Sequence, residues 1–499
     1  MSDNFFPAIH ENNKNTALVE QGNTISYADL NQRIEHFASG LLGDANDLQE
    51  ERIAFFIPAS IDYVTVMHGV WRAGGIAVPL NVQTAIAELE HYLASATVTR
   101  LIARQESHEA LTDLCSRLNI ALLTIDSVFS EIPKAMPETG PERRAMILFT
   151  SGTTNKPKGV VSSHKNIEAQ ITTLLDAWCW TKEDVIPLFL PLHHVHGIIN
   201  VLSCGLWCGA TVHLYPKFDI PVITREVVKD TFNLFMAVPT IYVKLIQYFE
   251  VLEAEGRQEE IKQICEGFGR MRLNISGSAA CPVKLFNQWQ ELTGQVLLER
   301  YGMTEIGMGI SNPYHGERRP GHVGQPLPGV QVQLFDEENQ PVETENTPGE
   351  IRIKGDNVFM EYWNNPQATQ ESDYEGWFCT GDMAVVENGY YRIMGRTSID
   401  IIKSGGYKLS ALEIEGVLLT HEAIKEVAVI GVEDETWGEA VAAVVVLKDG
   451  CSLEFEELKS WCKDHTSSYK IPKVLKGVES LPRNAMGKVT KPDLKTLFE

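Results

Sequence analysis

The stretch AMILFTSGTTNKPKGVVSSHKN, residues 145–166, is the most informative part of the chain. Its apolar portion, Met146 to Phe149, predicts a buried strand. Hydroxyl side chains, glycines and Lys158 follow directly. Small residues let backbone N–H groups approach an anion and the lysine adds positive charge, so the loop is suited to a polyphosphate. The spacing excludes a Walker A loop. On composition alone, an ordinary surface turn fits equally well.

Strands and helices alternate around this stretch. RIAFFIP (52–58) predicts a strand, residues 63–74 predict a helix that Gly74-Gly75 ends, and GIAVPL (75–80) predicts the next strand. This rhythm is typical of α/β layers with largely parallel sheets. From Val323 to Arg396, short β-like runs between Gly, Pro and Asn-Gly predict a small, mainly β region.

The pattern becomes mixed after Arg396. Ser410-x-x-Glu413 predicts a capping box at the start of a helix, and EVAVIGV and AVAAVVVL predict strands. We therefore expect an N-terminal domain of residues 1–396 and a C-terminal domain of residues 397–499. The predicted fold class is α/β: a large N-terminal domain of mixed and parallel α/β layers with a small β subdomain, followed by a small α+β C-terminal domain.

Composition restricts the partners and the compartment. The 499 residues include 43 basic and 66 acidic side chains, a net charge of −23, which argues against a nucleic-acid or anionic-membrane surface. Nine cysteines without a repeated spacing predict reduced thiols. The first residues, MSDNFFPAIHENNKN, lack export or import features, and the longest apolar stretch, 198–215, is too polar to span a bilayer. We expect a cytoplasmic protein.

TSGTTNKPKGV (150–160) resembles the phosphate loop of the adenylate-forming superfamily: acyl-CoA synthetases, peptide-synthetase adenylation domains and luciferases. The likeness spans nearly the whole chain, because further motifs of that superfamily follow in order. They are PLHHVHG (191–197), ISGSAAC (275–281), ERYGMTE (299–305), GWFCTGD (376–382), GYYRIMGR (389–396) and LPRNAMGK (481–488). The resemblance implies an ATP-dependent enzyme that adenylates a carboxylic acid and transfers the acyl group to coenzyme A.

The resemblance also implies a nucleotide site. Tyr301 offers a flat face to the adenine ring, and Thr304 and Glu305 are oxygen donors suited to Mg²⁺ and the phosphates. Asp382 can accept both ribose hydroxyls with support from Arg396, although a lone Asp after Gly is more often a turn residue. The predicted ATP-binding set is Thr150, Ser151, Gly152, Thr153, Thr154, Lys158, Gly277, Ser278, Ala279, Tyr301, Gly302, Thr304, Asp382 and Arg396.

Catalysis is implied to rest on Lys488, with Glu305 and Thr304. A compact ammonium offsets the charge that develops on the phosphoryl oxygens as the carboxylate attacks. The C-terminal domain is implied to be mobile and to rotate between the two half-reactions. Asp400 is the expected hinge, although the stretch from Arg396 to the glycine pair is one residue longer than the family pattern. The predicted CoA and hinge set is Asp400, Lys403, Ser404, Gly405, Gly406 and Tyr407.

The acid is predicted from charged residues where most relatives carry apolar ones. Arg300 precedes Tyr301, and His196, with His194 nearby, stands where an aromatic side chain is common. A guanidinium can bind a second carboxylate with two hydrogen bonds. ERYGMTE, SNPYHGERRPGHVG and GRTSIDIIKSGGYKLSALEIE resemble malonyl-CoA synthetases. We expect malonate as the acid, with methylmalonate left open.

Several alternatives stay open at this point. Arg300 could pair with an internal acid, Glu299 or Glu305, and never meet substrate. The enzyme could activate a medium-chain fatty or aryl acid, load a carrier protein in trans, or act oxidatively like a luciferase. A non-catalytic protein is disfavoured, because it has no physical need for the set Lys158, Glu305, Asp382 and Lys488. The expected small-molecule partners are a dicarboxylic acid, ATP and CoA.

Overall fold

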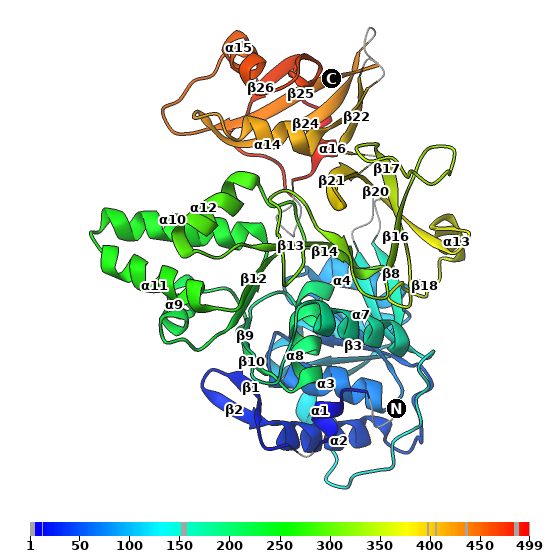
Figure 1. The fold of residues 1–499 in the computed structure, drawn as a ribbon. Helices are drawn as coiled ribbons and strands as arrows, with labels where there is room; N and C mark the ends of the chain where they lie inside the picture. The colour runs from blue at the N-terminus through cyan, green and yellow to red at the C-terminus, as the bar shows by residue number, and fades with distance from the viewer. Residues whose placement is uncertain are drawn as a thin grey trace.

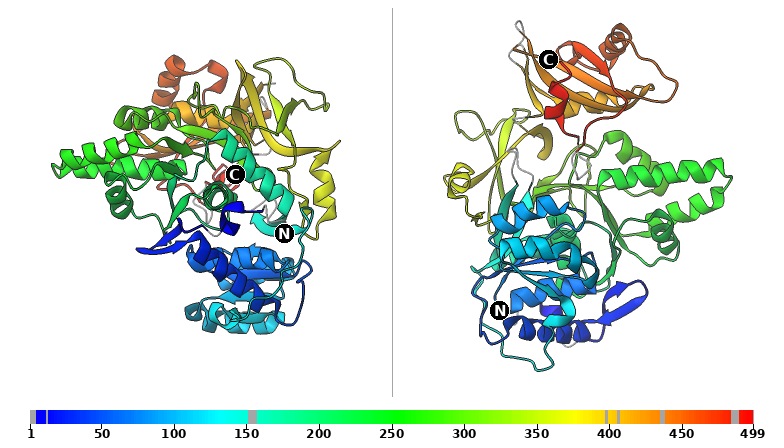
Figure 2. Two further views of the ribbon diagram at one scale, coloured as in Figure 1. Left: turned by 60° about the horizontal axis from the view of Figure 1, so that its bottom comes forward. Right: turned by 180° about the vertical axis from the view of Figure 1, so that it is seen from behind.

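The computed structural model describes residues 5–11, 13–150, 157–396, 399–404, 407–434, 438–483 and 489–498. The chain forms a large N-terminal α/β domain and a small C-terminal domain at one end of it (Figure 1). The reverse view keeps the C-terminal domain at that same end (Figure 2). The predicted fold class is therefore confirmed. The division between residues 396 and 397 stays a prediction.

A seven-stranded sheet forms the base of the N-terminal domain. Its order is β18-β8-β7-β4-β3-β5-β6, with bounds Glu361–Tyr362, Lys158–Ser163, Arg144–Thr150, Ile76–Pro79, Arg52–Phe56, Arg100–Ala103 and Ala121–Thr124. The five strands from β7 to β6 run parallel, and β8 and β18 add antiparallel edges. Both faces are buried: Ile53 packs into the large core on one side and Ala54 into a second core on the other. Continuous apolar strands are what such a sheet requires.

Two further sheets complete the large domain's core. The first has the order β2-β1-β10-β9, with bounds Asn23–Ser26, Thr16–Glu20, Thr211–Leu214 and Val185–Leu188. The second has the order β11-β12-β13-β14-β15, with bounds Leu234–Ala237, Leu273–Ser276, Leu298–Met303, Gly307–Ser311 and Gln325–Pro326. In the second sheet β11, β12 and β13 are parallel. Parallel strands end at one edge, which is where α/β proteins bind ligands.

Helices cover these sheets in Figure 1. In the N-terminal domain they are α1 Pro7–His10, α2 Tyr27–Leu42, α3 Ile61–Arg72, α4 Ile86–Ser95, α5 Gln105–Leu118, α6 Ile125–Val128, α7 His164–Ala177, η1 His196–Ser203, α8 Cys204–Cys208, α9 Ile220–Val228, α10 Pro239–Ala254, α11 Gln258–Arg270, α12 Val283–Thr293 and α13 Pro366–Glu371. The segment η1 is a π-helix, a form found most often at functional sites. In the part of the chain that the structure describes, no helix is long and apolar enough to cross a membrane.

The predicted β region after Val323 is present. Its sheet has the order β16-β17-β20-β19, with β21 paired to β20; the bounds are Gln331–Phe335, Gly349–Lys354, Trp377–Glu387, Asp373–Tyr374 and Tyr390–Arg396. Strand β21 ends at Arg396, opposite Asp382 of β20. This subdomain lies beside β8 and β18 and next to the C-terminal domain (Figure 1).

The C-terminal domain has one sheet, β23-β22-β25-β24, with β26 paired to β25. The bounds are Tyr407–Ser410, Ile401–Ser404, Gly438–Leu447, Ile424–Asp434 and Val474–Gly477, with helices α14 Ala411–Leu418, α15 Phe455–His465 and α16 Lys491–Lys495 and the 3₁₀ turn η2 Ser468–Lys470. Alternate residues of β24 face two different cores, as Val429 and Ala428 do. Ser410 caps α14 as predicted, but the Glu413 carboxylate pairs with Lys470 rather than completing a capping box.

Candidate active site

The site is assembled from chain segments at strand ends. Thr150 ends β7, Gly277 follows the last residue of β12, and β13 carries Arg300 and Tyr301. Glu305 lies in the turn between β13 and β14. Strands β12 and β13 are neighbouring parallel strands of one sheet, whereas β7 belongs to the seven-stranded sheet, so these residues come from two different sheets.

Asp382, the residue predicted to bind the ribose, is a buried carboxylate with two side-chain partners. The Tyr301 hydroxyl donates to Asp382 Oδ2 at 2.6 Å, and Arg396 Nε lies 3.2 Å from Asp382 Oδ1. Asp382 is 7% exposed. Burial raises the pKa of this carboxyl, while the Arg396 charge and the Tyr301 hydrogen bond lower it. The two partners fix both carboxylate oxygens in position before any ligand binds.

Lys158 and Glu305, the residues predicted to contact the phosphates and the metal, both lie against the side chain of Tyr362. The sequence analysis did not predict a role for Tyr362. The Tyr362 hydroxyl donates to Glu305 Oε1 at 2.9 Å, and Lys158 Nζ lies 4.9 Å from the centre of the Tyr362 ring. Burial raises the pKa of Glu305, and the Tyr362 hydrogen bond opposes the rise. Tyr362 reaches this place because β18 pairs with β8, whose first residue is Lys158. A tyrosine nearly 60 positions from Glu305 carries no local signal of that role.

The predicted acid site centres on Arg300. Its side chain is 4% exposed, and Nη2 donates to Ser278 Oγ at 3.3 Å. A Cβ added to Gly277 would lie 2.6 Å from the guanidinium carbon, so the guanidinium would have to shift if this position carried a side chain. Burial lowers the pKa of Arg300 to about 9. Ser278 itself has a φ of 67°, a strained value for serine that is typical of functional sites.

His196 joins this cluster from the first turn of η1. Ser278 Oγ lies 3.1 Å from His196 Nδ1. Because Arg300 Nη2 donates to the same oxygen, Ser278 Oγ links the His196 ring to the Arg300 guanidinium. Burial, then the charge of Arg300, holds the pKa of His196 well below its usual range. Within the described residues, His196 Nε2 and Arg300 Nε are buried nitrogens without a hydrogen-bond partner.

The two acids that could have neutralised Arg300 are engaged elsewhere. Glu299 lies on the other face of β13, where its Oε1 accepts from the Gly321 N–H at 2.9 Å, and Glu305 holds Tyr362. Neither of these two described residues forms an ion pair with Arg300. Burial raises the pKa of Glu299 to about 8, so this carboxyl is mainly neutral at pH 7. The charge of Arg300 is therefore not offset by its predicted internal partners.

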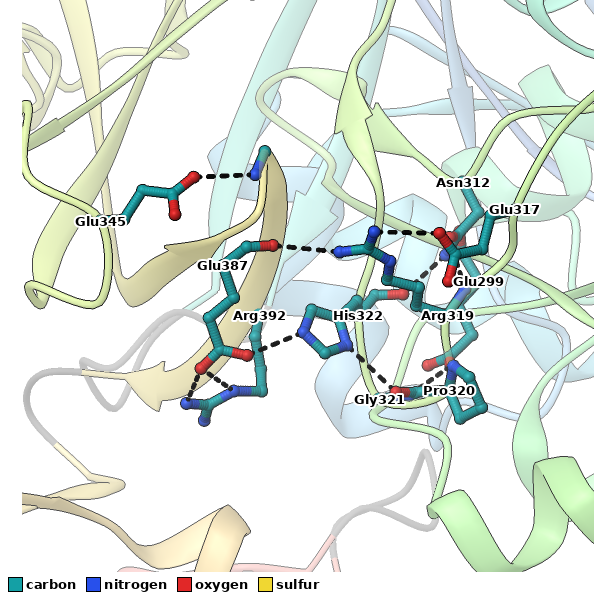
Figure 3. A network of polar contacts seen from close by, with 11 residues as sticks. Glu299, Asn312, Glu317, Arg319, Pro320, Gly321, His322, Glu345, Glu387 and Arg392 are labelled. Carbon is teal, nitrogen blue, oxygen red and sulfur yellow. Dashed lines mark hydrogen bonds and ion pairs between the residues drawn. The ribbon is translucent and has the colours of Figure 1, made fainter.

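The loop that holds Glu299 is fixed by a polar network (Figure 3). Asn312 donates to the carbonyls of Glu299 and His322 and accepts from the Arg319 N–H. His322 Nε2 lies 2.9 Å from Glu387, which also pairs with Arg392. The network therefore ties the acid-site strand β13 to the β20–β21 hairpin, whose last residue is Arg396.

The remaining predicted residues fall into three groups. Gly302 and Thr304 lie at the β13–β14 turn, and Ala279 is exposed after β12. The ring of His194 packs on that of His193, and its charge lowers the pKa of His196 further. Outside the described residues lie Ser151, Gly152, Thr153, Thr154, Gly405, Gly406 and Lys488, and of Tyr407 only the backbone in β23 is described.

Two residues of the predicted hinge and CoA set, Asp400 and Lys403, contact the large domain. Asp400 contacts Arg396 on one side and Lys491 on the other. Lys403 is exposed and pairs with Glu337 of the large domain at 3.4 Å, and Ser404 is buried at the end of β22. Their roles toward CoA stay predictions.

Residues 5–363 match the AMP-binding enzyme family, and residues 413–488 match the AMP-binding enzyme C-terminal domain. The chain belongs to the AMP-binding enzyme family. The superfamily predicted from the seven motifs is thus confirmed. The order of the motifs and the geometry above agree with this assignment.

Similar proteins narrow the position of this AMP-binding enzyme within its family. It is 42% identical to the mitochondrial malonate–CoA ligase of Bos taurus, over 96% of this chain and 87% of that protein. It is 39% identical to the malonate–CoA ligase of Arabidopsis thaliana, over 91% and 79% of the two chains. ATP-bound MatB from Rhodopseudomonas palustris has a TM-score of 0.90 at 31% identity, covering 100% and 99% of the chains. The apo form of MatB scores 0.81 at the same identity and coverage.

These relatives correct one prediction. The composition and the first residues predicted a cytoplasmic protein. However, the malonate–CoA ligases of Bos taurus, Xenopus laevis and Homo sapiens, each 42% identical to this chain, are mitochondrial. Reduced thiols and net charge do not distinguish these two compartments, so the prediction had no physical basis strong enough to separate them.

Proposed function

We propose that this AMP-binding enzyme is an ATP-dependent, AMP-forming ligase that converts malonate and CoA to malonyl-CoA through a malonyl-adenylate. The observation that carries the proposal is the buried guanidinium of Arg300, which has no carboxylate partner in Glu299 or Glu305 and is linked to His196 through Ser278 Oγ. A buried cation of this kind is costly unless an anion joins it. The distal carboxylate of a short dicarboxylic acid supplies that anion.

ATP is bound by residues that hold one another through hydrogen bonds and ion pairs. Tyr301 lies against the adenine, Asp382 accepts the ribose hydroxyls with Arg396 beside it, and Lys158 faces the phosphates. Glu305 suits Mg²⁺, which keeps few protein ligands and takes the rest from phosphates and water. When bound there, the ion neutralises polyphosphate charge.

The first half-reaction joins the two sites. With its distal carboxylate held by Arg300 and His196, malonate presents its other carboxylate to the α-phosphorus of ATP. An oxygen–phosphorus bond forms, and pyrophosphate leaves. Lys488 offsets the charge on the phosphoryl oxygens. Holding both reactants at fixed sites removes much of the entropic cost of their encounter.

The second half-reaction transfers the acyl group. The CoA thiolate attacks the acyl carbon of the malonyl-adenylate, the acyl–oxygen bond breaks, and AMP leaves with the electron pair. Rotation of the C-terminal domain about Asp400 would bring the segment from Lys403 to Tyr407 to the thiol path. The names of the mammalian and plant relatives support this reaction for the present chain, and the ATP-bound structure of MatB supports the use of ATP.

The proposal is tested by AMP and acyl-CoA formation with acetate, malonate, methylmalonate, succinate, octanoate and coumarate. We expect malonate to exceed the monocarboxylic acids by at least about 100-fold in kcat/KM, the worth of two charged hydrogen bonds. Highest activity with octanoate or coumarate would contradict the assignment of malonate. Faster transfer to a holo-carrier protein than to CoA would contradict the assignment of the acceptor.

A further inference from the structure

Lys491 is a buried lysine at the junction of the two domains. It begins α16, and its side chain is only 10% exposed. Its Nζ lies 2.6 Å from Asp400 Oδ1 and 2.7 Å from Glu415 Oε1. Lysine is rarely buried without such partners. Burial lowers the pKa of Lys491, but the charges of Glu415 and Asp400 outweigh this and raise it.

Asp400 connects Lys491 to the large domain. Its second oxygen, Oδ2, accepts from the Arg396 N–H at 3.0 Å, at the end of β21. Gly395 makes this approach possible: its φ is +118°, and a Cβ there would lie 2.2 Å from the Cβ of Asp400. The Asp400 carboxylate thus links the last strand of the large domain to the first residue of α16.

Glu415 connects Lys491 to the body of the C-terminal domain. It lies on α14 and also accepts from the Val429 N–H of β24 at 2.7 Å. Figure 1 shows α14, α16 and β21 together at the domain junction. Lys491 is therefore held by two carboxylates, one at the predicted hinge and one on the rigid part of the small domain.

Lys491 also stands at the base of the segment that carries Lys488 in the sequence. Arg483 and Val489 form an antiparallel bridge, and the Thr490 N–H donates to the Pro482 carbonyl at 2.9 Å. These contacts bring the two chains leading into and out of residues 484–488 together. Fixing Lys491 fixes the outgoing chain three residues after Lys488.

We propose that Lys491 is a positioning residue for adenylation, which ties the segment bearing Lys488 to the hinge through Asp400 and to the small domain through Glu415. The inference rests on the proposed function, because it assumes the two half-reactions given above. The chain also resembles the ATP-bound form of MatB more than its apo form.

The test compares the half-reactions in full-length variants. Lys491→Met leaves Asp400 and Glu415 buried without a cation, which can destabilise the fold. The variant Lys491→Met/Glu415→Gln reduces this effect, because it leaves one buried carboxylate, Asp400, without a cation instead of two, while the amide still accepts from Val429. We expect it to melt closer to wild type than Lys491→Met does and to lose about 10- to 100-fold in malonate-dependent ATP–pyrophosphate exchange, the range for a small misplacement of a reacting group.

Three further readouts separate positioning from a structural role. We expect unchanged dissociation constants for ATP and malonate, an unchanged rate when preformed adenylate is chased with CoA, and recovery of most of the exchange rate in Lys491→Arg. The control is Lys495→Met, an exposed lysine on the same helix. Wild-type exchange in Lys491→Met/Glu415→Gln, or equal loss of both half-reactions, would overturn the proposal. Lack of malonate-dependent exchange in the wild type would instead overturn the proposed function.

Discussion

The charged side chains of the nucleotide site have partners within the protein, whereas the charged side chain of the acid site has no carboxylate partner among the acids predicted for it. In the nucleotide site, Asp382 is held by Tyr301 and Arg396, and Glu305 by Tyr362. In the acid site, the buried guanidinium of Arg300 has only a serine hydroxyl as a side-chain partner among the described residues. The pairs in the nucleotide site hold their carboxylates in fixed positions for ATP, the substrate expected throughout the family. An unpaired cation instead leaves its charge for the substrate, and so selects the substrate.

The largest effect is expected from Arg300→Met, which removes the cation and keeps an apolar stem. Loss of two charged hydrogen bonds, worth about 1.5–3 kcal/mol each, lowers kcat/KM for malonate by at least ~100-fold. The dissociation constant for ATP should stay within about twofold, because among the described residues no side-chain hydrogen bond or ion pair joins Arg300 to Asp382. Arg270→Met is the control, since Arg270 is exposed and pairs with Asp230 at the surface. An unchanged kcat/KM for malonate in Arg300→Met would show that the buried cation does not select the substrate.

Gly277→Ala tests the same site through shape rather than charge. The added methyl would lie 2.6 Å from the guanidinium, so Arg300 has to move. We expect a fall of about 10-fold or more in kcat/KM for malonate, since small misplacements carry effects of that size. Gly140→Ala is the matched control, because a methyl there meets nothing within 4 Å. Equal activity of the two alanine variants would show that Arg300 is not held where the structure places it.

Tyr362→Phe tests the nucleotide site, where the charged side chains are paired within the protein. The ring stays for Lys158, but the hydrogen bond to Glu305 is lost. We expect the Mg²⁺ concentration for half-maximal exchange to rise about 10-fold, the worth of one hydrogen bond to a charged group. The KM for malonate should not change. A change in the malonate KM without a change in the Mg²⁺ requirement would mean that Tyr362 belongs to the acid site rather than to the nucleotide site.

The smallest effect concerns Glu299, whose pKa burial raises to about 8. The unfolded chain releases this proton near pH 4.5, so the folded state holds more protons between about pH 4.5 and 8, and stability falls as the pH rises through that window. The slope contribution is at most about 1.4 kcal/mol per pH unit. In Glu299→Gln the melting temperature should depend less on pH between pH 5 and 8. An unaltered pH profile would mean that Glu299 is ionised in the folded protein.

Much of the site was predictable because its residues are neighbours in sequence. Arg300, Tyr301 and Glu305 lie in one short motif, and strand alternation alone separates Arg300 from Glu299. Helices and strands such as α3 and β4 followed from apolar periodicity. The β region after Val323 followed from turn residues.

The rest depends on distant pairing. Tyr362 reaches Glu305 through the antiparallel contact of β18 with β8, and Gly277 meets Arg300 across two neighbouring strands. The same holds for Lys491, whose two carboxylates come from different elements. No periodicity or local composition reports such contacts. Ser278, predicted for the nucleotide, contacts His196 and Arg300, which places its hydroxyl within the acid-site cluster.

The most direct test of the central claim compares malonate with propionate, which replaces the distal carboxylate by a methyl group of similar size. ATP–pyrophosphate exchange should give a kcat/KM at least ~100-fold higher for malonate in the wild type. In Arg300→Met the two acids should come within about 10-fold of each other. Equal exchange with both acids in the wild type would contradict the account, because Arg300 and His196 would then have no carboxylate to bind.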